Sequence, residues 1–222
     1  MRWSEIVFCH WDVAPAVLTS WVPRWLTLDT RRGRAFVGIV SLRARGPVPP
    51  LFWRFAHRLP TYAQVNVRTY VKGPHGPGIL LHKTSVGSVL AAAGARLLGQ
   101  PYVPERAHIE HVGDQIEVES APLSLEGSDV DEAPSAPRGI QRWLLNREIL
   151  YGELPGRVPY HLRVLHPPWR VRRVTPILCE SRVPEIEHAQ PGGILRAEPV
   201  DANIVSLKPD GLPVRHAVEV PA

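Results

Sequence analysis

Prolines and glycines limit this chain to short structural elements. Its 222 residues include 24 prolines and 17 glycines, spread along most of the length. Proline interrupts helices, and both residues favour turns. Hydrophobic residues make up 44% and charged residues 21%, a balance that excludes wholesale disorder. The composition therefore favours a mainly β globular domain with many turns over a helical bundle.

One segment predicts a β-hairpin from its alternation alone. Between residues 63 and 72 apolar and polar side chains alternate, as in a strand whose two faces differ. Residues 73–78 read GPHGPG, a turn sequence, and residues 79–83 return as a second strand. The polar face of the first strand carries Gln64, Asn66, Arg68, Tyr70 and Lys72.

The remaining pattern predicts a single β-rich domain over residues 1–180. Strands are expected at 6–11, 35–42, 108–111, 115–121, 160–165 and 169–180. About three helices are expected, at 14–22, 88–98 and 137–150, and loops at 43–60 and 123–137. Residues 181–222 read as a proline- and glycine-rich tail, partly packed on the domain, with weak strands at 203–207 and 214–220.

The motifs of familiar metal, cofactor and nucleophile sites are missing from the sequence. Cys9 and His10 are neighbours on an expected strand, so their side chains point to opposite faces. The odd spacing of His108 and His111 separates their rings in the same way. No paired-cysteine, His-Glu-x-x-His, dinucleotide or phosphate-loop motif occurs. We therefore expect neither a metal nor a cofactor.

Basic residues exceed acidic ones by 26 to 21, and only three of them are lysines. The arginines form separate clusters at 31–34, 43–45 and 170–173. A nucleic-acid surface needs such charges merged on one face and interleaved with exposed aromatic side chains. We interpret these clusters as a solvated exterior. Nucleic acid is therefore not an expected partner, and binding to it would appear as strongly salt-dependent retention.

The alternation of polar and apolar residues at 63–72 does not determine whether the polar side chains are enclosed or exposed to water. If the apolar face packs outward against helices, the polar side chains line an enclosed pocket. If the apolar face forms the core, they meet water, which is the commoner arrangement in antiparallel sheets. A buried Arg68 among amides would bind a carboxylate or another oxyanion, because its guanidinium matches two oxygens.

Several motifs resemble one known family. They are HWDVAP at 10–15, GRAFVGIV at 33–40, NVRTYV at 66–71, WLLNR at 143–147 and HPPW at 166–169. In this order they resemble the YqjF-like family of unknown function, which belongs to the acetoacetate decarboxylase-like superfamily. The resemblance covers about residues 5–180. It implies a closed, mostly antiparallel β-barrel with helices outside and a pocket inside, lined by the strand at 63–72.

The catalytic residues of that superfamily do not carry over to this chain. The decarboxylases form a Schiff base through a lysine of lowered pKa. Tyr102 and Val103 stand where the lysines of that segment would lie. Gln64 stands where relatives often have a glutamate, and an amide is neither an acid nor a base at neutral pH. No catalytic residue is therefore assigned.

The sequence predicts a cytoplasmic protein that binds a small anionic or carbonyl-bearing metabolite. The expected site residues are Gln64, Asn66, Arg68, Tyr70, His82 and Tyr102, the last three as pocket walls implied by the resemblance. The alternative is a decarboxylase or aldolase that uses Lys72 or Lys83 as its amine. Apart from a small-molecule ligand, no membrane partner is expected, and both a monomer and a homo-oligomer are compatible with the sequence.

Overall fold

A computed structural model describes residues 1–46 and 61–209 of the chain. The strands before the first α-helix are β1 (Arg2–Val13), β2 (Thr27–Leu28), β3 (Ala35–Arg45), β4 (Thr61–Gly73) and β5 (Gly76–Val86). Those after it are β6 (Tyr102–Pro104), β7 (Ala107–Val112), β8 (Gln115–Ser120), β9 (Leu123–Asp129), β10 (Ile149–Leu154), β11 (Val158–Leu165), β12 (Val171–Ser181), β13 (Gly193–Ala197), β14 (Val200–Asp201) and β15 (Asn203–Pro209). The helical elements are η1 (Pro15–Trp21), α1 (Val89–Leu97) and α2 (Gly139–Leu145).

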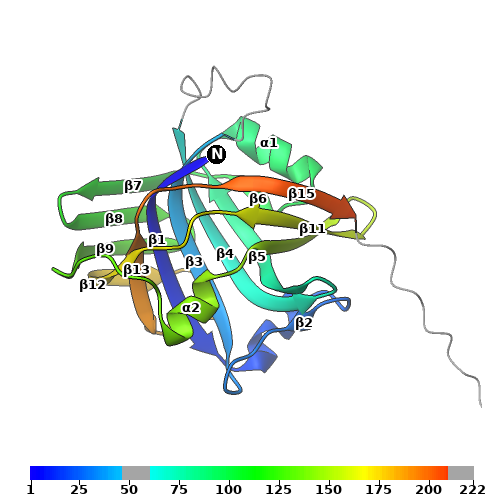
Figure 1. Cartoon of the computed structure of the whole chain (residues 1–222), viewed down its shortest axis with the longest axis horizontal. Helices are drawn as coiled ribbons and strands as arrows, with labels where there is room; N and C mark the ends of the chain where they lie inside the picture. The colour runs from blue at the N-terminus through cyan, green and yellow to red at the C-terminus, as the bar shows by residue number, and fades with distance from the viewer. Residues whose placement is uncertain (47–60, 210–222) are drawn as a thin grey trace, which may run out of the picture.

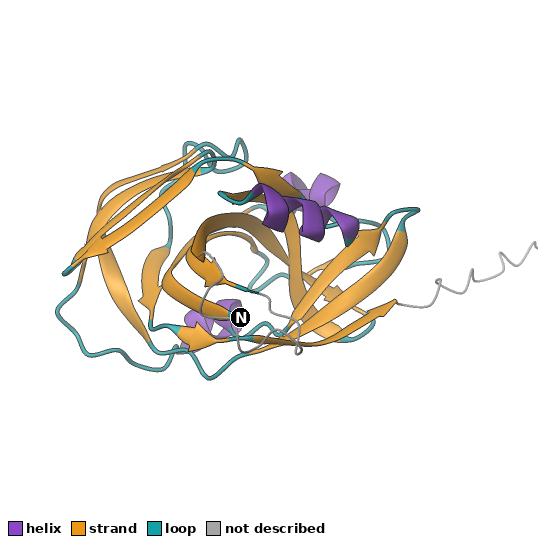
Figure 2. Cartoon of the chain, turned by 90° about the horizontal axis from the view of Figure 1, so that it is seen from above, coloured by secondary structure: helices purple, strands orange, loops and turns teal. Residues whose placement is uncertain are grey.

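The strands form one long, strongly curved sheet (Figures 1 and 2). Its hydrogen-bonded order is β15-β11-β10-β5-β4-β3-β1-β13-β12-β9-β8-β7, with β14, β2 and β6 attached beside it. The pairings are antiparallel except those of β5 with β10 and with β6. Within residues 1–46 and 61–209 no pairing joins the end strands β15 and β7. The mainly β fold is as expected, whereas closure of the barrel is not confirmed.

The central strands β1, β3 and β4 are buried on both faces. One face packs against β7, β8, β9 and β12 and forms the largest core cluster, with Val7, Cys9, Ile39, Val65, Val67, Ile109, Val118 and Leu125 among its members. The opposite face of β1 and β3 forms a second cluster with Trp169 and Leu195. A strand buried on both faces has no solvated side. Asn66, Arg68 and Tyr70 of β4 therefore lie inside the protein, whereas Gln64 is half-buried and Lys72, near the end of the strand, is exposed.

The predicted hairpin is confirmed as β4 and β5, and the helix at 88–98 as α1. Ser88 is the N-cap of α1, and its hydroxyl accepts a hydrogen bond from the Ala91 N–H at 3.2 Å. After α1 the chain turns at Gly99, which has a φ of +66°. A Cβ there would lie 1.8 Å from the carbonyl oxygen of Glu153 on β10. Only glycine fits this close approach.

Two boundaries predicted from the sequence are wrong. The helix expected through residue 150 ends at Leu145, and residues 149–154 form β10, which pairs with β5 and β11. The loop expected at 123–137 begins with strand β9, whose last residue Asp129 is buried between Arg172 and Arg196. Pairing with other strands determines both segments, which local propensity alone does not reveal.

The expected tail contributes strands β13, β14 and β15 to the same sheet. Strand β13 lies between β1 and β12, and β15 pairs with β11. The strand expected at 214–220 and residues 47–60 of the loop expected at 43–60 lie outside the described residues.

Candidate functional site

A row of residues across three strands forms the centre of the candidate site. In the register of the sheet His10 of β1 lies opposite Gly38 of β3, and Gly38 lies opposite Arg68 of β4. A Cβ on Gly38 would lie 3.1 Å from the Tyr70 hydroxyl and 3.4 Å from the Arg68 side chain. Because Gly38 has no side chain, Arg68 and Tyr70 extend across β3 towards β1.

Arg68 is a buried cation beside the aromatic rings of Phe8 and Tyr70. The residue is 9% exposed. Its guanidinium carbon lies 5.7 Å from the centre of the Phe8 ring and 5.8 Å from that of Tyr70. Among the described residues its Nε has no hydrogen-bond partner. No carboxylate in residues 1–46 and 61–209 forms an ion pair with Arg68.

His10 and Tyr70 form a buried, neutral hydrogen-bonded pair. The His10 Nε2 and the Tyr70 hydroxyl are 2.7 Å apart. Burial, together with the positive charge of Arg68, lowers the pKa of His10 to about 3. Burial raises the pKa of Tyr70, although Arg68 opposes this. Both side chains are therefore uncharged at neutral pH, and Arg68 gives this cluster its positive charge.

A second buried arginine, Arg147, also lies beside the Tyr70 ring. Arg147 follows α2, and its guanidinium carbon lies 5.4 Å from the centre of Tyr70 and 4.2 Å from that of Trp143. Its Nη1 forms an ion pair with Asp29 at 2.8 Å, and both side chains are almost fully buried. Arg147 is thus a buried arginine with a carboxylate partner, which Arg68 lacks among the residues that the structure describes.

Asn66, Gln64 and Tyr102 continue the polar face of β4. Asn66 is 6% exposed, and its Oδ1 has no hydrogen-bond partner. The Tyr102 hydroxyl donates a long hydrogen bond, 3.5 Å, to the Gln64 Oε1. Burial raises the pKa of Tyr102. Of the six residues expected at the site, the structure thus places Gln64, Asn66, Arg68 and Tyr70 along one strand, with Tyr102 in contact with Gln64.

His82 lies elsewhere. It is exposed and stacks on Trp21 of η1, with ring centres 3.9 Å apart. Partial burial lowers the pKa of His82, and Glu185 opposes this. The pairing of β4 with β5 shifts register between Val67 and Arg68, so residue 82 has no partner across the ladder.

The two lysines considered as Schiff-base amines form ion pairs away from Arg68. The Lys72 Nζ lies 3.2 Å from Asp29, and the lysine side chain is 60% exposed. The Lys83 Nζ lies 2.8 Å from Glu105, and its side chain is 38% exposed. Neither is a desolvated amine beside the buried row of His10, Gly38 and Arg68.

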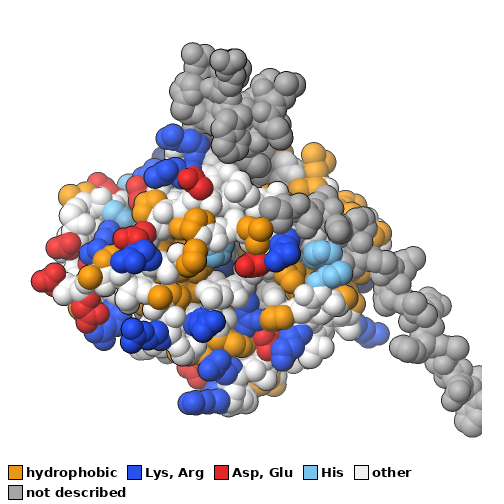
Figure 3. All heavy atoms as spheres, viewed as in Figure 1, with side chains coloured by type: hydrophobic (Ala, Val, Ile, Leu, Met, Phe, Trp, Pro, Cys, Tyr) orange, Lys and Arg blue, Asp and Glu red, His pale blue; other side chains and the backbone are white. Residues whose placement is uncertain are grey.

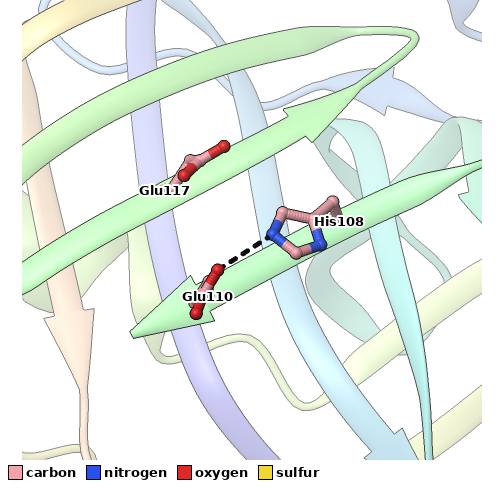
Figure 4. Close-up of side chains that lie close together, drawn as sticks. All are labelled: His108, Glu110 and Glu117. Atoms are coloured by element: carbon pink, nitrogen blue, oxygen red, sulfur yellow. Dashed lines mark hydrogen bonds and ion pairs between the residues drawn. The ribbon is translucent and has the colours of Figure 1, made fainter. Parts of the chain in front are cut away.

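A histidine and two glutamates gather on the hairpin of β7 and β8 (Figure 4). One ligand atom from each of His108, Glu110 and Glu117 lies within 4.8 Å of the others. The His108 Nε2 and a Glu110 carboxylate oxygen are 3.3 Å apart, and all three residues are exposed. His111, by contrast, is half-buried, and burial with Arg196 and Arg43 lowers its pKa to about 4. The two histidines therefore have separate environments, as their spacing predicts.

Two surface hollows are lined by residues other than Arg68, His10 and Tyr70. One of about 550 Å³ is lined by His75, His161, Asn146 and Arg163 among others. The second, of about 440 Å³, is lined by Arg170, Arg172 and Arg196 with glutamates. On the face in Figure 3 basic and acidic side chains are interspersed. Several exposed arginines form ion pairs, such as Arg163 with Glu148 and Arg173 with Glu132.

Several residues around Arg68 have no signal in the sequence that links them to it. His10 and Gly38 lie within motifs, but their register against Arg68 follows only from the pairing of β1, β3 and β4. Asp29 and Arg147 carry no spacing signal, because 118 residues separate them in the chain.

Comparisons with known proteins place the chain in a family. Residues 1–207 match the DUF2071 family, described as an uncharacterized conserved protein. The uncharacterized protein YqjF of Bacillus subtilis is 30% identical over 186 residues, which cover 75% of this chain and 72% of YqjF. The chain therefore belongs to the DUF2071 family and is a relative of YqjF.

Solved structures show the acetoacetate decarboxylase-like fold. The enduracididine biosynthesis enzyme MppR, in a complex with pyruvate, has a TM-score of 0.66 at 10% identity, covering 94% of this chain and 88% of MppR. An acetoacetate decarboxylase-like enzyme from Sphingomonas wittichii RW1 has a TM-score of 0.66 at 10% identity, covering 94% of this chain and 91% of that enzyme. Acetoacetate decarboxylase from Legionella pneumophila has a TM-score of 0.64 at 9% identity, covering 93% and 87%.

None of the helices in the described parts of the chain has both the length and the apolar character that a membrane crossing needs.

Proposed function

We propose that this protein binds a small metabolite with a carboxylate or carbonyl group at the buried polar face of β4, with Arg68 as its anion partner. The observation that supports this proposal is the burial of the Arg68 guanidinium beside neutral groups, without a carboxylate partner among the described residues. Burying an unpaired charge costs several kcal/mol. A ligand carboxylate would offset that cost with two charge-assisted hydrogen bonds.

Arg147 and Arg68 differ in their carboxylate partners. Both arginines are 9% exposed and both lie beside the ring of Tyr70. Arg147 has its carboxylate from Asp29 within the chain. Within the described parts of the chain Arg68 has none, so one of two similar guanidinium groups is left for an external anion.

The neighbours of Arg68 suit the rest of such a ligand. The amide of Asn66 offers N–H donors to a carbonyl oxygen, and its own oxygen is unpartnered. Tyr70 keeps its proton at neutral pH, and in the His10 tautomer whose Nε2–H donates to the Tyr70 oxygen, the tyrosine O–H is available to donate to a ligand. Phe8 offers an apolar surface beside the guanidinium. A short acid with an adjacent carbonyl combines the groups that these side chains recognise.

The fold likeness adds support of a weaker kind. MppR, which shares this fold, forms a complex with pyruvate, a small acid with an adjacent carbonyl. At 10% identity the likeness concerns the fold, so it guides the choice of the first ligands to test rather than the roles of residues.

Ligand-dependent thermal stability tests the proposal. Pyruvate, acetoacetate and acetate would be titrated into the wild-type chain, Arg68→Met and the control Arg45→Gln, which removes an exposed arginine on β3 that hydrogen-bonds Thr61. We expect a concentration-dependent rise in Tm for the wild type and for Arg45→Gln. Loss of a charge-assisted hydrogen-bond pair should weaken binding by about tenfold to hundredfold in Arg68→Met.

The outcomes separate a binding role from a structural one. Without ligand, Arg68→Met should be at least as stable as the wild type, because it removes an unpaired buried charge. A ligand response that persists in Arg68→Met contradicts the proposal, and so does a folded wild type that responds to none of the three acids.

The Schiff-base alternative has its own test. Borohydride reduction in the presence of pyruvate or acetoacetate would leave a mass adduct on a lysine that forms an imine. Because Lys72 and Lys83 are ion-paired and partly exposed, we expect no adduct on either. An adduct on one of them would make the enzyme reading the better one.

A further inference from the structure

Three side chains that can ligate a metal converge on the exposed face of the hairpin formed by β7 and β8 (Figure 4). His108 and Glu110 are two positions apart on strand β7, so both side chains point to the same face. Glu117 of β8 lies directly opposite Glu110 in the register of the sheet, which brings it to that face as well. The cluster therefore depends on an alternate spacing together with a strand pairing, and no linear motif in the sequence marks it.

The distances among the three side chains suit a single metal ion. One ligand atom from each lies within 4.8 Å of the other two, and the His108 Nε2 is 3.3 Å from a Glu110 carboxylate oxygen. Around a tetrahedral zinc ion, nitrogen and oxygen ligands lie about 3.3 Å from one another, because each is about 2.0–2.2 Å from the metal. All three side chains are exposed. Rotations about their own bonds can therefore close the remaining gap without a movement of the strands.

The charges on this face also favour a cation. Glu117 lies between two other carboxylates, Glu110 on β7 and Glu126 on β9, and each is directly opposite it. Like charges in this arrangement destabilise a sheet. His108 is the partner of Glu110, whereas Glu117 and Glu126 form no ion pair with a basic side chain in the described parts of the chain. A cation bound at Glu110 and Glu117 would turn their repulsion into a shared attraction.

We propose that His108, Glu110 and Glu117 form a binding site for one divalent transition-metal ion, of which Zn²⁺ is the best match. Imidazole nitrogen and carboxylate oxygen are both ligands of Zn²⁺, whereas Mg²⁺ and Ca²⁺ prefer oxygen ligands alone. Glu119, which lies opposite His108, is ion-paired with Arg182 and is not part of the ligand set. With three protein ligands, a fourth position of a tetrahedral ion remains for water.

The proposed metal site is separate from the proposed ligand site. Strands β7 and β8 stand at one end of the sheet order, whereas Arg68 lies on β4 near its middle (Figure 1). The two sites share no side chain. Metal binding would join the end strand β7 to β8 by bonds other than those of their backbone ladder, and would stabilise that end of the sheet. The outcome of its test therefore does not depend on the proposed function.

Isothermal titration calorimetry of the full chain with zinc chloride tests this proposal, and thermal unfolding gives a second readout. We expect saturable binding of one Zn²⁺ per chain and a rise in Tm that grows with the Zn²⁺ concentration. Magnesium and calcium chloride at the same concentrations should give no comparable rise. A chain that binds no Zn²⁺, or one that responds equally to Mg²⁺, would overturn the proposal.

Two ligand variants and a matched control assign the binding to these side chains. His108→Gln and Glu117→Gln each remove one ligand and should weaken Zn²⁺ binding by about tenfold or more, since even the loss of an outer partner of a metal site has an effect of that size. Glu126→Gln removes the same charge from the same row but no proposed ligand, so it should bind Zn²⁺ as the wild type does.

The metal-free proteins provide the check on folding. Without metal, Glu117→Gln should have a higher Tm than the wild type, because it relieves the repulsion with Glu110 and Glu126, so its weaker Zn²⁺ binding cannot come from unfolding. If Glu126→Gln weakens binding as much as Glu117→Gln does, the row attracts cations only through its charge. If both ligand variants bind Zn²⁺ like the wild type, the ion binds elsewhere in the chain. Either result contradicts the proposal.

Discussion

The buried histidine beside Arg68 makes a quantitative prediction about stability at acid pH. The pKa of His10 is about 3 in the folded protein against 6.5 when unperturbed. Below pH 6.5 His10 is therefore protonated in the unfolded chain, whereas in the folded chain it stays neutral down to about pH 3. Above pH 6.5 the titration of His10 takes nothing from the free energy of unfolding. As the pH falls from 6.5 towards 3, this free energy decreases.

The size of this loss follows from the shift. Each pH unit inside the window costs about 1.4 kcal/mol. Between pH 6.5 and pH 5, His10 should remove about 2 kcal/mol from the free energy of unfolding, a large share of the stability of a typical domain. Replacement by glutamine, which does not titrate and offers an amide towards Tyr70, removes this dependence.

Urea unfolding, followed by tryptophan fluorescence at pH 7, 6 and 5, measures the effect. His10→Gln should be less stable than the wild type at pH 7, and the difference should shrink by about 2 kcal/mol at pH 5. His188→Gln changes a histidine whose side chain is 93% exposed and serves as the control, with a curve parallel to the wild type. A curve for His10→Gln that is also parallel to the wild type would refute the reasoning.

Other predictions follow from single contacts. Arg68→Met should raise the pKa of His10 while leaving it below 6.5, because burial remains; an unchanged pKa by NMR titration would show that the charge of Arg68 does not reach the ring. Glu117→Lys should stabilise the protein by about 0.2–1 kcal/mol in thermal unfolding, because Glu117 lies directly opposite Glu110; a loss of stability would contradict this. Gly99→Ala should lower Tm strongly or prevent folding, since a Cβ there meets a backbone carbonyl at 1.8 Å, and a wild-type Tm would contradict the packing.

Much of the sheet could be predicted from the sequence because its signals are local. The alternation at 63–72 and the following turn determine β4 and β5, and Gly113 marks the turn between β7 and β8. The strand at 149–154 could not be predicted in this way. It continues a helical pattern in the sequence and becomes a strand only through pairing with β5 and β11.

The candidate site was predictable in part for the same reason. Parity places Asn66, Arg68 and Tyr70 on one face, and the structure has both faces of β4 buried. The partners of that face come from elsewhere in the chain. The contact of His10 with Tyr70 depends on the order β1-β3-β4, which no local pattern encodes. The position of His82 depends on a register shift in β5, which has no signal in the sequence.

A crystal structure of the wild-type protein soaked with pyruvate tests the central claim most directly. The account predicts the carboxylate of pyruvate within hydrogen-bonding distance of the Arg68 guanidinium, with its carbonyl oxygen near Asn66 or Tyr70. Pyruvate bound instead in the hollow beside His75 and His161, or an Arg68 paired with a carboxylate of the chain itself, would contradict it.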